Sequence, residues 1–389
     1  MNSLYGKVAI VGAADTQVGV VPNFSATGLC VDAAYRAIED AGITKEKIDG
    51  LITCNSMAEP FMYHAEAIAE NLQIFPRFTM TVNAGGGTTF SALHVAASAI
   101  VTGMCETVLI AMGDSLRSGL SRDQAMAMQA SAGHSQFEIP FGPTVPAFYG
   151  LIARAHMEKY GTTPEQFAKI AVTARKHASL NPSAQMRELI TIEDVMNSRM
   201  IADPLHLLDC SLVSDGGSAI ILTSAERAKD YKNQPVYLLG VGEGHSHEHI
   251  SQAHQLTTSA AVEAGKRAFE MSGLTPRDID FAELYDCFTP TVLIELEDLG
   301  FCKKGEGGDL IDSGEIELGG TLPVNTHGGL LSHCHPGNPG SMFALTEAVT
   351  QMRHQAGERQ VHKANVALVH GQGGIMSSHT TLILGREVG

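Results

Sequence analysis

The sequence contains no apolar run of the roughly 18 residues that a membrane-spanning helix needs. Its first residues, MNSLYGKVAIVGAADTQ, carry polar and acidic side chains where a signal peptide would have its apolar core. These two absences predict a globular protein of the cytoplasm. The 389 residues, of which 44% are hydrophobic, allow two domains of typical size around a large buried core.

Basic residues and paired cysteines are also scarce. Lys and Arg number 26 against 42 Asp and Glu, so the net charge of −16 repels a nucleic-acid backbone. The cysteines are odd in number and never spaced as CxxC, which excludes a disulfide framework and a zinc motif and predicts reduced thiols. They are Cys30, Cys54, Cys105, Cys210, Cys287, Cys302 and Cys334.

Two further signals are incomplete. The stretch VAIVGAAD (8–15) begins like a dinucleotide-binding unit but lacks the second and third glycines of that fingerprint. The tract GHSHEH (244–249) has three histidines, which in a polar loop are more often solvated than metal-bound. We therefore predict neither a nicotinamide cofactor nor a metal.

What the sequence does contain is an internal repeat. RAIEDAGITKEKID (36–49) and RAFEMSGLTPRDID (267–280) share most of their pattern, and each reads as a helix ended by glycine and followed by a strand. Further counterparts follow in the same order. They are two glycine-rich helix entries, near residues 90 and 343, and two pairs of strands, 106–114 with 364–374 and 218–224 with 380–386.

The repeat predicts two α/β halves, 1–232 and 233–389. The first half carries an extra segment at about 115–205, rich in helical pattern and punctuated by prolines. Long insertions in α/β folds are commonly lids or substrate loops, so we expect a cap over the active site. A peripheral helical decoration is the alternative.

Several motifs in order carry a resemblance across essentially the whole chain. They are DPLHLLDCSLVSDGGSAIILTSAERA (203–228), ELYDCF (283–288), GGLLSHCHPGNPG (328–340) and HGQGGI (370–375). Together they resemble the thiolase superfamily in its sterol-carrier-protein-x-like branch. The resemblance implies a five-layered αβαβα fold, a dimer formed through the N-terminal half, and an acyl-CoA substrate with coenzyme A as co-substrate and no tightly bound cofactor.

The resemblance also implies a site, from which one residue is missing. Thiolases place a nucleophilic Cys at the start of a buried helix, and VNAGG puts Gly86 at that position. Backbone amides of Gly86, Gly87, Gly373 and Gly374 remain available to hold a thioester oxygen. The thiolase histidine carries over to His335, the polarising residue to Tyr285 and the C-terminal acid/base to His370.

Two thiols are candidates to replace the missing nucleophile. Cys287 lies at a position that lines the pocket in the family, although free Cys is also a common core residue. Cys334 lies between two histidines, which would lower its pKa, although it replaces a glycine in tight packing. Tyr285 is read as a general acid/base, with a buried, satisfied hydroxyl as the alternative.

Three functions stay open at this point. A thiol at 287 or 334 would give thiolysis of a 3-oxoacyl-CoA, with an aromatic substrate such as benzoylsuccinyl-CoA as one candidate, and we favour this reaction. Without a thiol, Tyr285 could remove a β-hydroxyl proton in a retro-aldol cleavage, as in bacterial steroid side-chain aldolases of the superfamily. The third function is a non-catalytic acyl-CoA-binding scaffold. Relatives of both catalytic kinds work beside a small zinc-finger/OB-fold protein, so we expect such a partner.

Overall fold

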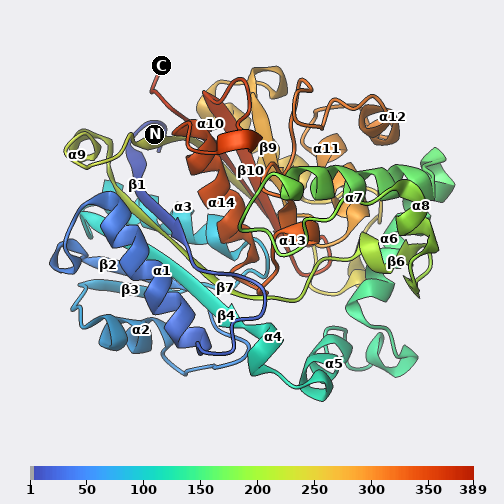
Figure 1. The fold of residues 1–389 in the computed structure, drawn as a ribbon, viewed down its shortest axis with the longest axis horizontal. Coiled ribbons are helices and arrows are strands. Elements are labelled where there is room, and N and C mark those ends of the chain that lie inside the picture. The colour runs from blue at the N-terminus through green and yellow to red at the C-terminus, as the bar shows by residue number, and fades with distance from the viewer. Residues whose placement is uncertain (1–3) are drawn as a thin grey trace.

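The computed structural model describes residues 4–389 (Figure 1). Within them, nine strands form one mixed sheet in the order β3-β2-β4-β7-β1-β8-β11-β10-β9. The strands are β1 (Val8–Asp15), β2 (Gly50–Thr53), β3 (Phe78–Thr81), β4 (Thr107–Ser115), β7 (Asp215–Ser224), β8 (Val236–His245), β9 (Phe281–Leu284), β10 (Val366–Gly373) and β11 (Ser378–Gly385). β5 (Met200–Ala202) and β6 (Leu205–His206) pair separately.

The sheet falls into two halves that follow the sequence repeat. β1 to β7 of the large sheet come from the first half of the chain and β8 to β11 from the second. They join where β1 pairs with β8 through Ala9 with Tyr237 and Ile10 with Val236. The two sheets expected from the resemblance are therefore hydrogen-bonded edge to edge by a short ladder.

Helices cover and separate the two halves of the sheet, as Figure 1 shows. α3 (Thr88–Val101) and α14 (Gly340–Met352) contact each other and strands of both halves, and their side chains share one apolar core with those strands. α1 (Ala26–Ala41) packs on β1, β4 and β7, and α10 (Ala261–Ser272) packs on β8 and β11. The predicted alternation of helix and sheet layers is confirmed.

The repeated helix ends also follow the predicted pattern. α1 ends at Gly42 with φ 69° and α10 ends at Gly273 with φ 71°, left-handed conformations that glycine adopts without strain. Each is followed by a short 3₁₀ turn and then by a parallel strand, β2 in one half and β9 in the other. The remaining helices outside the insertion are α2 (His64–Leu72), α9 (Ala225–Ala228), α11 (Thr289–Asp298), α12 (Gly307–Asp312) and α13 (Gly329–Ser332).

The insertion is helical, as expected, and part of it is buried. Its helices are α4 (Leu116–Gly119), α5 (Arg122–Ala130), α6 (Val145–Tyr160), α7 (Pro164–Ser179) and α8 (Ile192–Asn197). Phe148 and Ile152 of α6 and Phe167 of α7 join an apolar core with residues of α11. α6 and α7 are thus part of the C-terminal half's packing. No helix within residues 4–389 is long and apolar enough to cross a bilayer.

Candidate active site

Two glycine turns, one from each half, touch at the start of α3. A Cβ atom on Gly85 would lie 2.8 Å from Gly373 Cα and 3.1 Å from Gly374 N. No side chain fits between backbones that approach so closely, which explains the glycines on both sides. Gly85 also has φ 56°, a conformation that other residues avoid. The predicted meeting of the VNAGGG and HGQGG segments therefore occurs.

The space above Gly86 is already taken. A Cβ atom on Gly86 would overlap the ring of Tyr285 and the carbonyl oxygen of Gln372. The phenol of Tyr285 thus occupies the volume in which a nucleophilic side chain at position 86 would lie. The ring of Tyr285 therefore lies at the start of α3, where the resemblance would place a cysteine.

Tyr285 forms a hydrogen-bonded pair with His335. The hydroxyl Oη lies 3.0 Å from His335 Nε2, and the other ring nitrogen, Nδ1, lies 2.8 Å from Ser211 Oγ. Burial raises the pKa of the phenol well above 10 and lowers the pKa of the imidazole to about 4. At neutral pH the pair is therefore an uncharged phenol and an uncharged imidazole that can pass a proton between them.

The segment that carries His335 is anchored from the residue next to Tyr285. The buried carboxylate of Asp286 accepts hydrogen bonds from the amides of Leu330 (2.7 Å) and Leu331 (3.3 Å) in α13. A Cβ atom on Gly329, which has φ 64°, would overlap that carboxylate. Tyr285 and His335 are thus positioned by adjoining residues of the same two segments.

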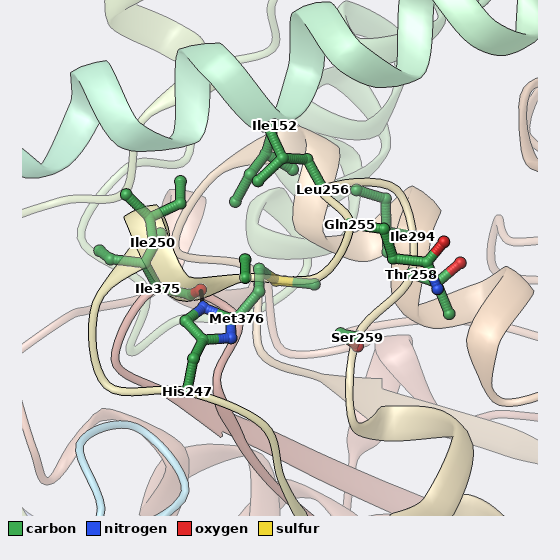
Figure 2. Close-up of a pocket in the computed structure, with 11 residues that line it drawn as sticks. Ile152, His247, Ile250, Gln255, Leu256, Thr258, Ser259, Ile294, Ile375 and Met376 are labelled. Atoms are coloured by element: carbon green, nitrogen blue, oxygen red, sulfur yellow. Dashed lines mark hydrogen bonds between the residues drawn. The ribbon is translucent and has the colours of Figure 1, made fainter.

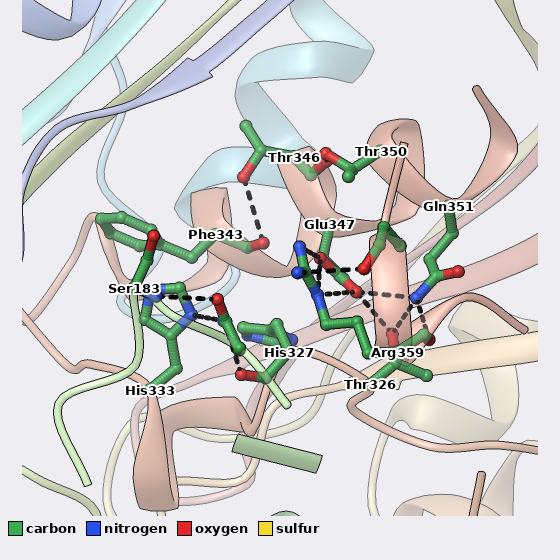
Figure 3. A network of polar contacts seen from close by, with 12 residues as sticks. Ser183, Thr326, His327, His333, Phe343, Thr346, Glu347, Thr350, Gln351 and Arg359 are labelled. Atoms are coloured by element: carbon green, nitrogen blue, oxygen red, sulfur yellow. Dashed lines mark hydrogen bonds and ion pairs between the residues drawn. The ribbon is translucent and has the colours of Figure 1, made fainter. Parts of the chain in front are cut away.

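A buried polar network lies beside Thr326 and His327, which precede α13, and Figure 3 shows part of it. Glu347 of α14 binds Arg359 at 2.9 Å and accepts hydrogen bonds from Thr326 and Gln351, both at 2.8 Å. His327 lies 2.8 Å from Glu283 of β9, which raises the pKa of this imidazole against the effect of burial. The hydrogen bonds of Glu347 with Thr326, Gln351 and Arg359 hold these residues together, whereas Glu283 and His327 interact only as an ion pair.

Cys287 lies close to Tyr285 and Gln372, and its side chain is a protonated thiol and not a thiolate. Gln372 Nε2 donates to its sulfur at 3.0 Å and to Tyr149 Oη at 2.8 Å, and Tyr149 donates to the carbonyl of Gly374 at 3.1 Å. Burial raises the pKa of the Cys287 thiol far above its usual value. The prediction that Cys287 lies at the pocket is compatible with this geometry, whereas its action as a thiolate is not favoured.

The expectation for Cys334 needs a correction. Its flanking histidines were expected to lower its pKa, but burial lowers the pKa of both imidazoles and leaves them uncharged. Burial also raises the pKa of the Cys334 thiol well above its usual value, and the side chain is 1% exposed. Neither neighbour therefore supplies the positive charge that would stabilise a thiolate.

His370 also requires a correction, because it lies on the wrong face of β10. A Cβ atom on the next residue, Gly371, would meet Phe90 at 2.5 Å and the carbonyl of Gly86 at 2.8 Å, so that position faces α3. Since successive residues of a strand point to opposite faces, His370 points away from α3. Its ring contacts Thr381 at 2.8 Å and His379 at 3.0 Å. The structure does not bring it to Tyr285 and His335.

Sequence reasoning missed several side chains that shape the site. Ser211 lies inside the run 203–228 and Gln372 inside HGQGG, so the motifs marked both without indicating their contacts. Asp286 lies inside ELYDCF in the same way. Tyr149 comes from the insertion and had no signal in the sequence, although its hydroxyl reaches the C-terminal glycine turn.

Two family models together cover most of the chain. Residues 8–226 match the model of the thiolase N-terminal domain and residues 242–386 that of the thiolase C-terminal domain-like family. The chain belongs to the thiolase family. The predicted boundary between 232 and 233 lies between the two matched ranges and stays a prediction.

Individual relatives are of two kinds. The chain is 36% identical over 371 residues to an acetyl-CoA acetyltransferase of Methanothermobacter thermautotrophicus, covering 94% of this chain and 96% of the relative. It is 36% identical over 401 residues to a steroid side-chain-cleaving aldolase of Thermomonospora curvata, covering 100% of both. It is 37% identical over 364 residues to a 17-hydroxy-3-oxo-4-pregnene-20-carboxyl-CoA lyase of Mycobacterium tuberculosis, covering 90% of this chain and 92% of the relative.

One solved structure is similar throughout its length. It is an Ltp2-ChsH2(DUF35) aldolase, which superposes with a TM-score of 0.88 at 36% identity and covers 98% of both chains. Matches to sterol carrier protein 2, such as the rabbit protein at 33% identity over 362 residues, confirm the predicted branch of the superfamily. The chain is therefore a thiolase-fold enzyme whose relatives include both acyltransferases and CoA-ester lyases.

Proposed function

We propose that this chain cleaves the Cα–Cβ bond of a 3-hydroxyacyl-CoA by a retro-aldol reaction. The observation that carries the proposal is the position of Tyr285, whose ring fills the volume beyond Gly86 and whose hydroxyl lies 3.0 Å from His335. Thiolysis, the reaction favoured from the sequence, becomes the alternative because the thiols of Cys287 and Cys334 are buried and have raised pKa values.

The reaction needs a base at the hydroxyl and a cradle for negative charge. The β-hydroxyl gives its proton to Tyr285 Oη as the phenol's own proton passes to His335 Nε2. The Cα–Cβ bond then breaks, its electron pair enters the thioester as an enolate, and the β-carbon becomes a ketone or aldehyde. A proton returned to the α-carbon completes a shortened acyl-CoA, so no oxidant and no second CoA are consumed.

The enolate oxygen is the group that the glycine turns would hold. Gly86 and Gly87 precede α3, where the helix dipole favours negative charge. The Gly87 amide already donates to the carbonyl of Ala84 at 3.1 Å, so the Gly86 amide is the proposed donor on this side. Gly373 and Gly374 approach from the other half, with the Gly374 amide 3.1 Å from the Cβ position of Gly85. Such preorganised donors typically contribute about 3 kcal/mol each to an oxyanion transition state.

The relatives' names support the same choice of substrate. Two of them are named as an aldolase and as a lyase of a hydroxylated steroid CoA ester. We therefore propose a bulky 3-hydroxyacyl-CoA of the steroid side-chain type. Benzoylsuccinyl-CoA has a 3-oxo group and offers Tyr285 no hydroxyl proton, so it fits this site less well.

One comparison supports a protein partner as well. The similar solved structure is titled as a complex of Ltp2 with ChsH2, a DUF35 protein. We propose that this chain forms a homodimer and also pairs with a small protein of that kind, and that coenzyme A is bound as part of the substrate. The predicted zinc-finger and OB-fold character of the partner stays a prediction.

Two substrates and one variant test the proposed reaction. The purified chain, alone and with any copurifying partner, is incubated with a 3-hydroxyacyl-CoA without free CoA, and separately with the matching 3-oxoacyl-CoA plus CoA. We expect ketone release from the first and no acyl transfer with the second. Tyr285→Phe should slow cleavage by about 10²-fold or more while CoA-ester binding persists, whereas exposed Tyr63→Phe should match wild type.

The other outcomes discriminate the alternatives. Acylated Cys287 or Cys334 peptides and CoA-dependent thiolysis would establish the acyltransferase and end the retro-aldol proposal. Binding of the CoA ester with neither reaction, with the partner present, would leave the scaffold function.

A further inference from the structure

Behind the proposed catalytic pair lies a buried cluster of three groups that the reaction does not use. Glu295 of α11, His370 of β10 and His379 of β11 all have ligand-type atoms within 4.8 Å of one another. His370 Nε2 lies 3.0 Å from His379 Nδ1 and 4.0 Å from Glu295 Oε1. All three side chains are fully buried.

The carboxyl group of Glu295 lacks polar partners in this cluster. Neither of its carboxylate oxygens has a hydrogen-bond partner among residues 4–389. The amide of Tyr285 is close enough to lower the Glu295 pKa somewhat, but burial and the carboxylates of Asp286 and Asp298 raise it far more. The facing imidazoles stay neutral, because burial lowers the pKa of both. A buried carboxylate without a partner is costly unless a proton or a cation compensates it.

We propose that Glu295, His370 and His379 bind one divalent transition-metal ion of the kind that prefers imidazole, with Zn²⁺ as the probe. Two neutral imidazoles and one carboxylate are a common ligand set for such ions. Zn²⁺ holds tetrahedral nitrogen and oxygen ligands about 3.3 Å apart. The observed separations of 3.0 and 4.0 Å bracket this value, so small shifts of the side chains complete the site.

The surroundings of the cluster fit a metal centre in two respects. Thr381 Oγ1 lies 2.8 Å from His370 Nδ1 and can accept its proton, so that Nε2 presents a lone pair to the cluster. In the structure this lone pair faces His379 Nδ1 at 3.0 Å, and a bound metal ion would replace that hydrogen bond. The carbonyl of Met376 lies beside the His379 ring, although His379 Nε2 forms no hydrogen bond among residues 4–389. The second nitrogen of a metal-bound imidazole usually has an oxygen partner of this kind.

Figure 2 shows a small pocket whose lining includes residues next in the chain to Glu295 or in contact with the His379 ring. Its lining includes Ile294, which precedes Glu295 in the chain, and Met376, whose carbonyl lies beside the His379 ring. His247 lines it as well. Its volume of about 10 Å³ admits a water molecule or an ion but no acyl chain. His247 comes from the GHSHEH tract, so that tract lies beside the proposed centre without supplying its ligands.

The ion would connect α11 to the strands β10 and β11 next to the proposed active site. Glu295 belongs to α11, which begins at Thr289, shortly after Tyr285, whereas the two histidines belong to the paired strands β10 and β11. A metal bound by all three ties the helix that follows Tyr285 to the strand that ends in the C-terminal glycine turn. The proposed role is structural, because none of the ligands contacts Tyr285 Oη or His335 among the described hydrogen bonds.

Metal content of the wild-type chain tests the proposal directly. The protein is purified without a metal-affinity step, dialysed against ZnCl₂ and then against buffer, and measured by inductively coupled plasma mass spectrometry. We expect about one equivalent of metal per chain, with X-ray absorption showing nitrogen and oxygen neighbours at about 2.0–2.1 Å. Less than about a tenth of an equivalent, or sulfur neighbours at about 2.3 Å, would overturn the proposal.

Variants assign the ligands. Glu295→Gln and His379→Gln keep the side-chain volume nearly unchanged and should lower the bound metal at least tenfold. Exposed His362→Gln should retain the wild-type content. If a zinc-bearing partner copurifies, the difference between wild type and Glu295→Gln gives the metal of this chain. Full content in both ligand variants would refute the assignment, and the wild-type spectrum decides the matter if they fail to fold.

Discussion

At position 86 a side chain would have to share its space with Tyr285. The ring carbons and the Gln372 carbonyl already fill the volume around the Cβ position, so glycine is a steric requirement there. The absence of a nucleophile is therefore tied to the presence of the phenol. Sequence alone could mark Gly86 as a departure from the family, but not the residue 199 positions later that fills its place.

Gly86→Cys should not create a thiolase. The added side chain must displace Tyr285, so we expect retro-aldol activity to fall at least tenfold and the free energy of unfolding to drop by about 2 kcal/mol, measured by urea denaturation. Gly28→Ala in α1 is the control, because its Cβ would meet its nearest neighbour at an ordinary 3.4 Å. Acylation of the introduced thiol by a 3-oxoacyl-CoA would contradict this steric account.

His335 predicts an unusual pH profile for the cleavage. The imidazole must be uncharged to accept the proton of Tyr285, and burial lowers its pKa from 6.5 to about 4. kcat/KM should therefore rise with pH around a midpoint near 4 and stay level to pH 9, because the raised pKa of Tyr285 lies above that range. Circular dichroism at each pH separates ionisation from unfolding. A midpoint near 6.5 would contradict the lowered pKa of His335, and an unchanged profile in His335→Gln would exclude this residue as the acceptor.

Among the elements, those set by local rules were the ones that sequence could predict. The glycine ends of α1 and α10, the strands that follow them and the glycine entries to α3 and α14 all depend on nearby residues. Nearby residues do not determine which side of β10 faces α3. The alternation of side chains along a strand fixes which residues share a face, but not which neighbouring element that face contacts. His370 was misassigned for this reason, and Gly371 occupies the position facing α3.

Asp286, the residue after Tyr285, connects the segment that follows β9 to α13 through its carboxylate. Asp286→Ala leaves two buried amides, those of Leu330 and Leu331, without an acceptor. We expect about 3 kcal/mol of lost stability by urea denaturation and a fall in kcat larger than any rise in KM. Asp278→Ala, which removes an exposed carboxylate bonded to the Thr275 amide, should cost much less. Equal losses in both variants would show that the α13 anchor has no special weight.

At the scale of the molecule, the site exists because the two halves meet. The first half supplies the glycines that precede α3 (85–87). The second half supplies Tyr285, His335 and the opposing glycine turn (373–374). The internal repeat made this convergence predictable, since equivalent helix entries in two related halves face each other across a buried layer. The preference for a reaction through the Tyr285 phenol over one through a cysteine thiol depends on atomic distances at the start of α3, which sequence motifs do not give.

The exposed apolar residues of the N-terminal half predict how the chain assembles. Large apolar side chains are exposed in the segment 61–80, most strongly Phe75 (98%) and Met62 (89%), and β3 in this segment lies at the end of the strand order. An open sheet edge with apolar neighbours is a pairing surface, so the N-terminal half should form the proposed homodimer. Light scattering should then give a mass about twice 41.3 kDa.

Charges placed on that surface should separate the subunits. In the double variant Met62→Glu/Phe75→Glu, two carboxylates from each subunit would have to lose water in the interface, so we expect a single chain of 41.3 kDa at micromolar concentration. Leu189→Glu, at an exposed position in the insertion, should leave the dimer intact. Because the proposed site contains residues of one chain only, the separated variant should keep measurable cleavage. A wild-type protein that is already monomeric at these concentrations would disprove the assignment of this surface.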